Sequence, residues 1–244
     1  MKKLIILQND YPSTGKSTLA RCFSRYLNQF GVQHQLMTLA EEPDSADEHT
    51  LDSTRLTPRE LLQIIDASPI TMIEIATGTG EFFSKFYQTH ELDQVLNEAG
   101  VALSVVLPVT SESDSFDGVI EAAEVYSDNA EYLIAHLITS SYEDDDKVWD
   151  SSYAARVMDM FEAVELHIPE IGFQTELQLR AQHMDLATAI LNPDAEELLG
   201  KDFSKWSKRV MGQVDSARQF LFGDAFKPTT APKQPTKKAR ARAA

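Results

Sequence analysis

Short apolar runs alternate with amphipathic stretches along most of this chain, and this alternation limits the fold more than any other feature. Six runs are strand candidates: KLIILQ (3–8), VQHQLMTLA (32–40), ITMIEIA (70–76), VALSVVLPV (101–109), EYLIAHLIT (131–139) and AVELHIP (163–169). The stretches between and after them predict helices at 16–30, 58–67, 81–89, 91–99, 113–127, 149–163, 174–190 and 195–221. This order predicts an α/β fold with a doubly wound, mostly parallel sheet and a ligand site at the carboxyl ends of the strands.

Some helix ends carry their own signals. Gly31 is placed to end the first helix in a left-handed conformation. Thr57 and Glu60 have the spacing of a capping box, and Pro58 stands at the first helical position of the second helix. The acidic segment 41–54 lies between the strand expected at 32–40 and the helix expected at 58–67, and it is interpreted as a loop.

Composition limits the class of protein. The 244 residues are 43% hydrophobic and 25% charged, which is typical of a soluble globular protein, and residues 1–226 fit one domain. The lone cysteine, Cys22, excludes an intrachain disulfide and favours a reducing compartment. No run approaches the about 18 to 20 apolar residues of a membrane span, and the amino-terminal run is too short for a signal peptide. We therefore expect a cytoplasmic protein without a membrane span.

The last 18 residues, KPTTAPKQPTKKARARAA (227–244), differ in composition from the rest. They carry six Lys or Arg and no acid, so residues 1–226 have a net charge of −22 against −16 for the whole chain. The segment lacks large apolar residues, and we expect it to be disordered. A basic tail binds DNA, RNA or an acidic protein through charge, whereas the acidic body repels nucleic acid. A solvated terminus without a partner is the open alternative.

The segment between the first strand and the first helix ends like a phosphate-binding loop. Gly15, Lys16, Ser17 and Thr18 form the end of the motif G-x-x-x-x-G-K-[ST], although Asp10 replaces its first glycine. In such a loop the backbone N–H groups at the helix start bind phosphate, the Lys reaches the β- and γ-phosphates, and the hydroxyl binds Mg²⁺. The sequence therefore predicts a binding site for ATP and Mg²⁺.

The layout resembles the ParA/MinD family of partition and septum-placement ATPases, whose deviant loop K-G-G-x-G-K-[ST] also lacks the first glycine. The matching residues are Tyr11 to Ser17, and IEIATGTGE (73–81) and VVLPVTSESDSFDGV (105–119) take the place of two further family segments. The similarity covers about residues 1–190, and only Gly15–Thr18 matches a specific motif. It implies a P-loop NTPase fold, ATP hydrolysis and a nucleotide-dependent homodimer.

The resemblance also assigns roles to residues. It implies that Thr14, Gly15, Lys16, Ser17 and Thr18 bind the nucleotide. Ser17 and Glu74 are matched to the groups that hold Mg²⁺, and Lys16 and Glu74 to the catalytic ones. Three features depart from the family pattern. Tyr11 replaces the Lys that reaches the partner's nucleotide, Pro12 lacks an N–H, and the second-strand acids are matched by Thr38 and Ala40, with Glu41, Glu42 and Asp44 following.

Three functions remain open at this point. The first is a ParA/MinD-like ATPase or switch in DNA partition, plasmid mobilisation or conjugative transfer, working with a partner protein and touching DNA through the tail. The second is a catalytically decayed adaptor that binds a partner protein, which Tyr11 and Pro12 favour. The third is a small-molecule kinase, for which Arg55 and Arg59 are the available lid cations.

Other side chains are weighed against ordinary structural roles. His136 lies in an apolar strand, and we expect a hydrogen-bonded core histidine; the other histidines show no metal-ligand spacing. Cys22 is expected to be a packed thiol. Trp149, Trp206, Phe220 and Phe222 are expected to be core residues, with a partner surface as the alternative. The acidic run EDDDK (143–147) is a solvated loop or a cation site. The basic stretch 204–214 is an amphipathic helix or a docking face.

Overall fold

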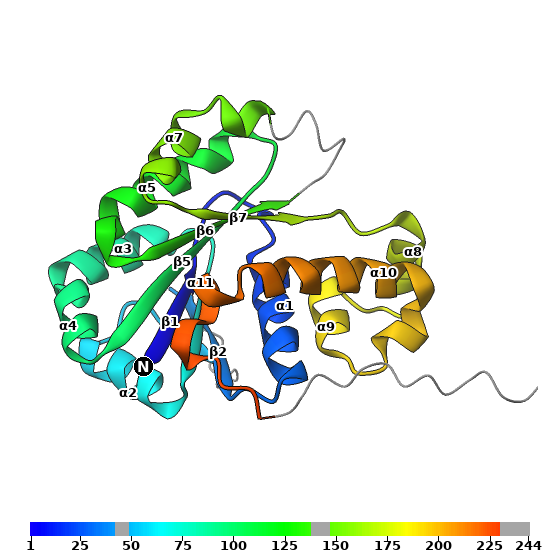
Figure 1. The fold of residues 1–244 in the computed structure, drawn as a ribbon, viewed down its shortest axis with the longest axis horizontal. Helices are drawn as coiled ribbons and strands as arrows, with labels where there is room; N and C mark the ends of the chain where they lie inside the picture. Colours follow the sequence, from blue (N-terminus) through cyan, green and yellow to red (C-terminus); the bar gives the residue numbers. More distant parts are fainter. Residues whose placement is uncertain (42–48, 138–146, 230–244) are drawn as a thin grey trace, which may run out of the picture.

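The protein, described by a computed structural model over residues 1–41, 49–137 and 147–229, is a three-layer α/β structure (Figure 1). Its sheet has seven strands among the described residues, in the order β3-β2-β4-β1-β5-β6-β7, and every pairing is parallel. The strands are β1 (Lys2–Leu7), β2 (His34–Ala40), β3 (Thr50–Asp52), β4 (Ile70–Ile75), β5 (Val101–Val109), β6 (Glu131–Leu137) and β7 (Val164–Ile168). The predicted parallel, doubly wound sheet is thus confirmed.

The helices lie on both faces of the sheet, as the buried side chains require. Their bounds are α1 (Lys16–Gln29), α2 (Pro58–Ala67), α3 (Gly80–Thr89), α4 (Leu92–Glu98), α5 (Asp117–Tyr126), α7 (Tyr153–Met160), α8 (Phe173–Ala181), α9 (Leu186–Leu191), α10 (Ala195–Ser216) and α11 (Arg218–Phe222). Short 3₁₀ turns lie at Ser113–Phe116, Ser127–Asn129 and Gly223–Ala225. No helix among these residues is long and apolar enough to cross a membrane.

Successive residues of β1 contribute to two separate cores. Ile5 and Leu7 pack with α1 and α8 to α11 on one face, and Leu4 and Ile6 pack with α2 to α5 and α7 on the other. Side chains alternate between the faces of a strand, so a strand covered on both sides needs an uninterrupted apolar run. This is why KLIIL is apolar at every position except the paired Lys3.

Several predicted boundaries are wrong in informative ways. The acidic segment 41–54 contains the short strand β3, which pairs with the end of β2. The single helix expected at 174–190 is two helices, because His183 adopts a left-handed φ of 49° and Asp185 caps α9 through the N–H of Thr188 at 2.7 Å. The helix expected at 149–163 is likewise interrupted at Ser152, whose hydroxyl caps α7.

The helix expected at 195–221 is also interrupted. Gly200 leaves helical geometry inside α10 with a φ of 77°, and α11 follows as a separate helix. The expected strand 131–139 ends at Leu137 within the described part of the chain, and residues 138–139 lie outside it. The capping box of Thr57 and Glu60 and the left-handed Gly31 after α1 are both confirmed.

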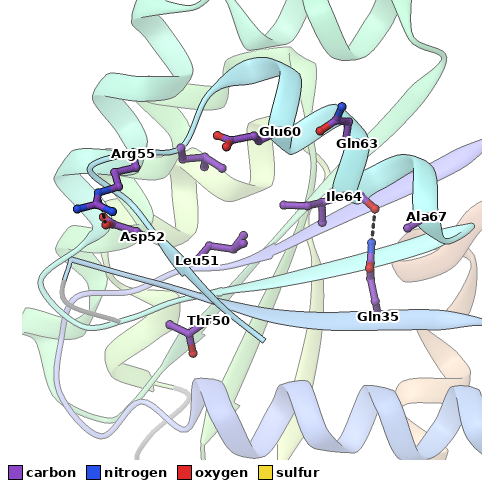
Figure 2. Close-up of a pocket in the computed structure, with 10 residues that line it drawn as sticks. Gln35, Thr50, Leu51, Asp52, Arg55, Glu60, Gln63, Ile64 and Ala67 are labelled. Carbon is purple, nitrogen blue, oxygen red and sulfur yellow. Dashed lines mark hydrogen bonds and ion pairs between the residues drawn. The ribbon is translucent and has the colours of Figure 1, made fainter. Parts of the chain in front are cut away.

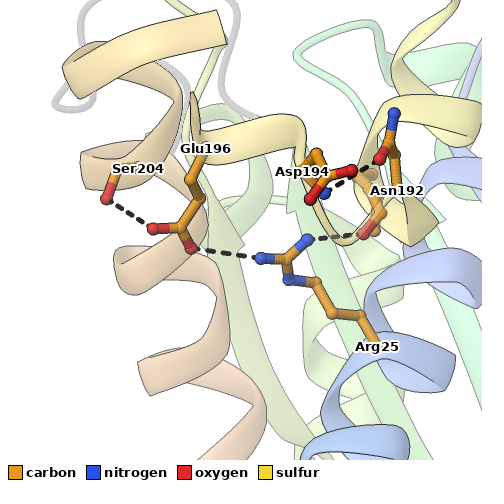
Figure 3. A network of polar contacts seen from close by, with 6 residues as sticks. Arg25, Asn192, Asp194, Glu196 and Ser204 are labelled. Carbon is orange, nitrogen blue, oxygen red and sulfur yellow. Dashed lines mark hydrogen bonds and ion pairs between the residues drawn. The ribbon is translucent and has the colours of Figure 1, made fainter. Parts of the chain in front are cut away.

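A polar network attaches the carboxyl-terminal helices to α1 (Figure 3). The guanidinium of Arg25 donates to the carbonyl oxygen of Ile190 at 2.7 Å and to the carboxylate of Glu196 at 3.1 Å. Glu196 also accepts from the hydroxyl of Ser204 at 3.0 Å. Arg25 therefore joins α1 to the end of α9 and to α10, on the face of the sheet that carries the first core.

Candidate functional site

The strand order places a candidate site at β1. This strand lies between β4 and β5; the chain runs from β1 to β2 on one side of the sheet, whereas it runs from β5 to β6 on the other. In open parallel sheets, ligands bind at the carboxyl ends of strands where the order reverses in this way. The segment that follows β1, residues 8–15, is called the first loop below, and it leads directly into α1.

The conformation of the first loop depends on Gly15. This residue precedes α1 with a φ of 74° and a ψ of 19°, in the left-handed region that favours glycine. A Cβ at this position would also overlap Cδ2 of Leu137, the last residue of β6. Both observations favour glycine here. As the N-cap residue, Gly15 has no side chain to cap the N–H groups at the start of α1.

Lys16 crosses from α1 toward the turn that follows β4. Its ammonium donates to the carbonyl oxygen of Asn9 and, at 3.2 Å, to the hydroxyl of Thr77. The side chain is buried, and this burial lowers the pKa of the ammonium, while the charges of Asp10 and Glu74 oppose the shift. A cation held among these oxygens is placed to bind an anion at the loop.

The hydroxyl of Ser17 donates to the carboxylate of Glu74, so the structure brings together the two residues assigned to magnesium. Glu74 follows Met72 on the face of β4 that α1 covers, and it is buried near the end of the strand. Thr38 on β2 is its register partner. A hydroxyl and a carboxylate beside a phosphate loop are suitable ligands for Mg²⁺ or for its water molecules.

Thr14 supplies a further unsatisfied group. Its side chain is buried, and its hydroxyl has no hydrogen-bond partner in the part of the chain that the structure describes. Buried hydroxyls are normally paired, so an unpaired one in a loop of this kind is available for a ligand oxygen. Together with Gly15, Lys16, Ser17 and Thr18 at the helix start, it fits a phosphate group and its metal ion.

The first half of the loop, residues 8–12, is held by hydrogen bonds that the sequence did not reveal. Asn9 donates from its amide to the carbonyl oxygens of Pro108 and Ser115, both at 2.8 Å, and accepts from the N–H of Tyr11. Asp10 accepts from the N–H groups of Gly78 and Gly80 in the turn after β4. Asn and Asp are frequent in turns, and this preference was the signal in the sequence. Their hydrogen-bond partners lie far along the chain and could not be inferred from the sequence.

The departures from the family pattern remain in the structure. Pro12 and Ser13 are exposed, and Ser13 takes a left-handed φ of 59°. Tyr11 is partly exposed and offers no charge. Glu41 is exposed beyond the end of β2, while Glu42 and Asp44 lie outside the described residues. The second-strand position next to Glu74 is therefore a threonine without a carboxylate.

A separate cavity of about 480 Å³ lies between α2 and the β2–β3 edge (Figure 2). Its lining contains no residue of the first loop, and most of the exposed lining area is apolar. Arg55 at its rim forms an ion pair with Asp52 at 3.2 Å. This exposed ion pair lies beside the separate cavity, and Arg59, the other candidate lid cation, is exposed on α2.

The remaining expectations concern single side chains. Cys22 is fully buried, and burial raises the pKa of its thiol to about 12, so the packed-thiol interpretation is confirmed. Trp149, Trp206 and Phe222 are buried in the core, as expected, but the expectation was wrong for Phe220, which is 41% exposed. His136 is buried and hydrogen-bonded, also as expected, but it lies against His167, which residue spacing did not predict. Residues 143–146 of the acidic run lie outside the described chain.

The basic stretch 204–214 belongs to α10. Trp206, Val210 and Val214 face the core, and Lys205 is exposed with an ion pair to Asp202 at 3.6 Å. The stretch is therefore an amphipathic helix with a charged outer face. Of the basic tail, residues 227–229 are described, and the N–H of Thr229 donates to the carbonyl oxygen of Phe30 at 3.0 Å.

The site is thus defined by geometry: a left-handed glycine before a helix, a buried lysine, and a hydroxyl–carboxylate pair at the carboxyl ends of β1 and β4. Comparison with protein-family models found no matching family, and comparison with curated proteins found no similar sequence.

Proposed function

We propose that this chain is a nucleotide-binding ATPase or switch of the ParA/MinD type, with a P-loop NTPase fold. The observation that carries the proposal is the convergence of Lys16, Ser17 and Glu74 beside the uncapped start of α1. Lys16 and Ser17 begin α1 and Glu74 lies near the end of β4, and they meet because β1, which leads into α1, pairs with β4. A helix start, a lysine and a hydroxyl–carboxylate pair are what binding of a triphosphate with Mg²⁺ requires.

Each residue has one role in this proposal. The N–H groups of Gly15 to Thr18 and the hydroxyl of Thr14 would bind phosphate oxygens, and Lys16 would neutralise the β- and γ-phosphates. Ser17 would hold Mg²⁺, and Glu74 would orient a water molecule of that ion. Binding of a nucleotide requires Lys16 to exchange the carbonyl oxygen of Asn9 for phosphate oxygens. Nucleotide binding would therefore change the contacts of Asn9 and of the first half of the loop.

The biological setting proposed is DNA partition, plasmid mobilisation or conjugative transfer in the cytoplasm. The acidic body carries a net charge of −22, so contact with DNA is assigned to the basic tail 227–244 or to a partner protein. Association into a homodimer with ATP is the expected switch. Tyr11 in place of a lysine implies that such a dimer lacks the cross-subunit charge of the family.

A non-catalytic adaptor is the second candidate, and the first half of the loop favours it. Pro12 offers no N–H, and the ammonium of Lys16 is already held by Asn9 and Thr77. In this candidate the loop has lost nucleotide affinity and the fold serves to present a surface. The kinase candidate is less favoured, because Arg55 lines the separate cavity, whose lining contains no residue of the first loop.

Calorimetry with ATP and ADP in the presence of Mg²⁺ tests the proposal on the full chain. We expect micromolar binding by the wild type and a loss of about a hundredfold in Lys16→Ala, since a charge-assisted contact to phosphate is removed. Lys85→Ala is the matched control, because Lys85 is an exposed lysine on α3 paired with Glu81. Ser17→Ala should reduce the dependence of binding on Mg²⁺.

Binding by neither nucleotide would overturn the switch and leave the adaptor. Where binding is found, sedimentation velocity with ATP and with ADP separates the remaining candidates. A larger species with ATP alone supports a nucleotide switch, and an unchanged monomer contradicts it.

A further inference from the structure

A cluster of three metal-ligating side chains lies on the outer strands of the sheet, in β6 and β7. His136 on β6 and His167 on β7 are register partners, and Glu165 precedes His167 by two residues. Because side chains alternate along a strand, Glu165 and His167 share one face of β7, and His136 is on the same face of β6. This is the face of the sheet that α7 covers, where Ile134 and Trp149 are buried.

The three side chains are already close to a chelating arrangement. One ligand atom from each residue can be chosen so that all three lie within 4.8 Å of one another. Nε2 of His136 is 3.0 Å from a carboxylate oxygen of Glu165, and the two imidazole rings stack with centroids 4.9 Å apart. Donors bound to one ion at about 2.0 to 2.2 Å lie between 3 and 4 Å apart, so small side-chain rotations would close the site.

The surrounding residues orient the cluster as those around metal sites do. The indole N–H of Trp149 donates to the other carboxylate oxygen of Glu165 at 3.0 Å. The same ring packs edge-on against His136, with centroids 5.1 Å apart. Outer partners that fix a ligating carboxylate and an imidazole are a regular part of metal sites. Trp149 thus restricts both ligands before any ion arrives.

We propose that His136, Glu165 and His167 bind one divalent transition-metal ion of the zinc type. Two imidazole nitrogens and one carboxylate oxygen form a ligand set suited to zinc, and imidazole ligands disfavour Mg²⁺ and Ca²⁺. Three protein ligands leave a fourth position for water or for a ligand from another molecule. The site is separate from the first loop and uses none of the residues assigned to the nucleotide.

Two features show how the site fits into the fold. His136 is buried, whereas Glu165 is exposed and His167 is half-buried, so the cluster is open to solvent on the β7 side. Leu137 directly follows His136 and lies against Gly15 of the first loop. The end of β6 therefore borders both sites, on opposite faces of the strand.

The first test is titration of the untagged full chain with zinc chloride after chelator treatment, followed by calorimetry. We expect one ion per chain, with binding at least about a hundredfold weaker in His167→Ala and in Glu165→Gln, since losing even outer partners costs about ten- to a hundredfold. His90→Ala and Glu170→Gln are the controls, because both residues are exposed and neither belongs to the cluster. Circular dichroism checks that each variant is folded, and His136→Ala is avoided because that residue is buried.

A second readout uses the tryptophan beside the cluster. In a Trp206→Phe background the fluorescence comes from Trp149, and a paramagnetic ion such as Co²⁺ bound at the cluster should quench it. The quenching should disappear in His167→Ala and persist in His90→Ala. It should also persist in Lys16→Ala, which keeps this test independent of nucleotide binding.

Absence of zinc binding by the folded wild type would overturn the proposal, and so would binding that both cluster variants retain in full. The latter result would place the ion elsewhere in the chain. In either case His136, Glu165 and His167 would be a hydrogen-bonded structural cluster.

Discussion

The carboxylate of Asp10 accepts a hydrogen bond from the backbone N–H of Gly78 at 3.1 Å, and the same oxygen accepts from Gly80 at 3.3 Å. The residue that replaces the first glycine of the loop motif therefore binds the turn after β4. A Cβ at Gly80 would lie 2.6 Å from this carboxylate, so the close approach depends on glycine. The first loop and the turn after β4 are held together at this point.

Removal of this contact should loosen the turn at 77–80. We expect Asp10→Ala to lower the local stability of the turn by about 1 kcal/mol, since hydrogen bonds to a charged and partly exposed acceptor are lost. Exchange of the Gly78 and Gly80 amides should be about fivefold faster, measured by hydrogen–deuterium exchange. Asp10→Asn keeps an acceptor oxygen and should show a smaller effect, and equal exchange in all three proteins would contradict this role.

Gly15→Ala should destabilise the fold through two separate causes. A left-handed φ costs a residue with a Cβ about 1 to 2 kcal/mol, and the new methyl group would overlap Leu137. Unfolding by urea measures the sum. Adding Leu137→Ala should relieve the overlap alone, so the double variant should be more stable than the two single losses predict. Strict additivity would show that Leu137 moves aside without cost.

The ion pair between Lys3 and Glu131 should respond unequally to removal of its two members. The Lys3 side chain is 2% exposed and that of Glu131 is 52% exposed. Glu131→Gln leaves a buried ammonium without its counter-charge and should cost about 1 to 2 kcal/mol, reduced by solvent at the carboxylate. Lys3→Met should be nearly neutral, because an apolar side chain of similar length replaces the buried charge.

The effect of Glu131→Gln on stability should also depend on pH. Burial lowers the pKa of Lys3, whereas the contact with Glu131 opposes that shift. A lysine whose pKa is lowered in the folded state binds fewer protons there than in the unfolded chain, so its penalty shrinks as pH rises toward about 10.4. The stability gap between wild type and Glu131→Gln should therefore narrow between neutral pH and about pH 10, as denaturant unfolding at both values would show.

Cys22 should be inert in the folded protein. Burial raises the pKa of its thiol to about 12, which leaves about one thiolate in ten thousand at pH 8. A disulfide reagent such as DTNB should label the chain only after denaturant is added, with one thiol per chain. Rapid labelling of the native protein would mean that α1 opens readily around this residue.

The parallel sheet could be predicted because its determinants are local. A strand buried on both faces needs a continuous apolar run, and LIIL at 4–7 and VVL at 105–107 satisfy that need by themselves. The approach of Ser17 to Glu74 was expected through the family resemblance, which matched both residues to groups that hold Mg²⁺, and the structure places the two side chains in contact.

Other features depend on register and could not be predicted. His136 and His167 are 31 positions apart and meet only because β6 and β7 pair in one particular alignment. The short strand β3 lacks an apolar run and exists through pairing with the end of β2. The break before α9 depends on the left-handed geometry of His183, which a helical pattern does not reveal.

The contacts of Thr229 determine where the basic segment leaves the folded body. Its N–H and hydroxyl donate to the carbonyl oxygens of Phe30 and Gly31, just beyond the end of α1, and the first loop lies at the other end of that helix (Figure 1). A helix of 14 residues is about 21 Å long. The described chain thus ends about one helix length from the start of α1. In the proposed function, a phosphate bound at the first loop and the residue that leads into the basic tail would therefore lie at opposite ends of one helix.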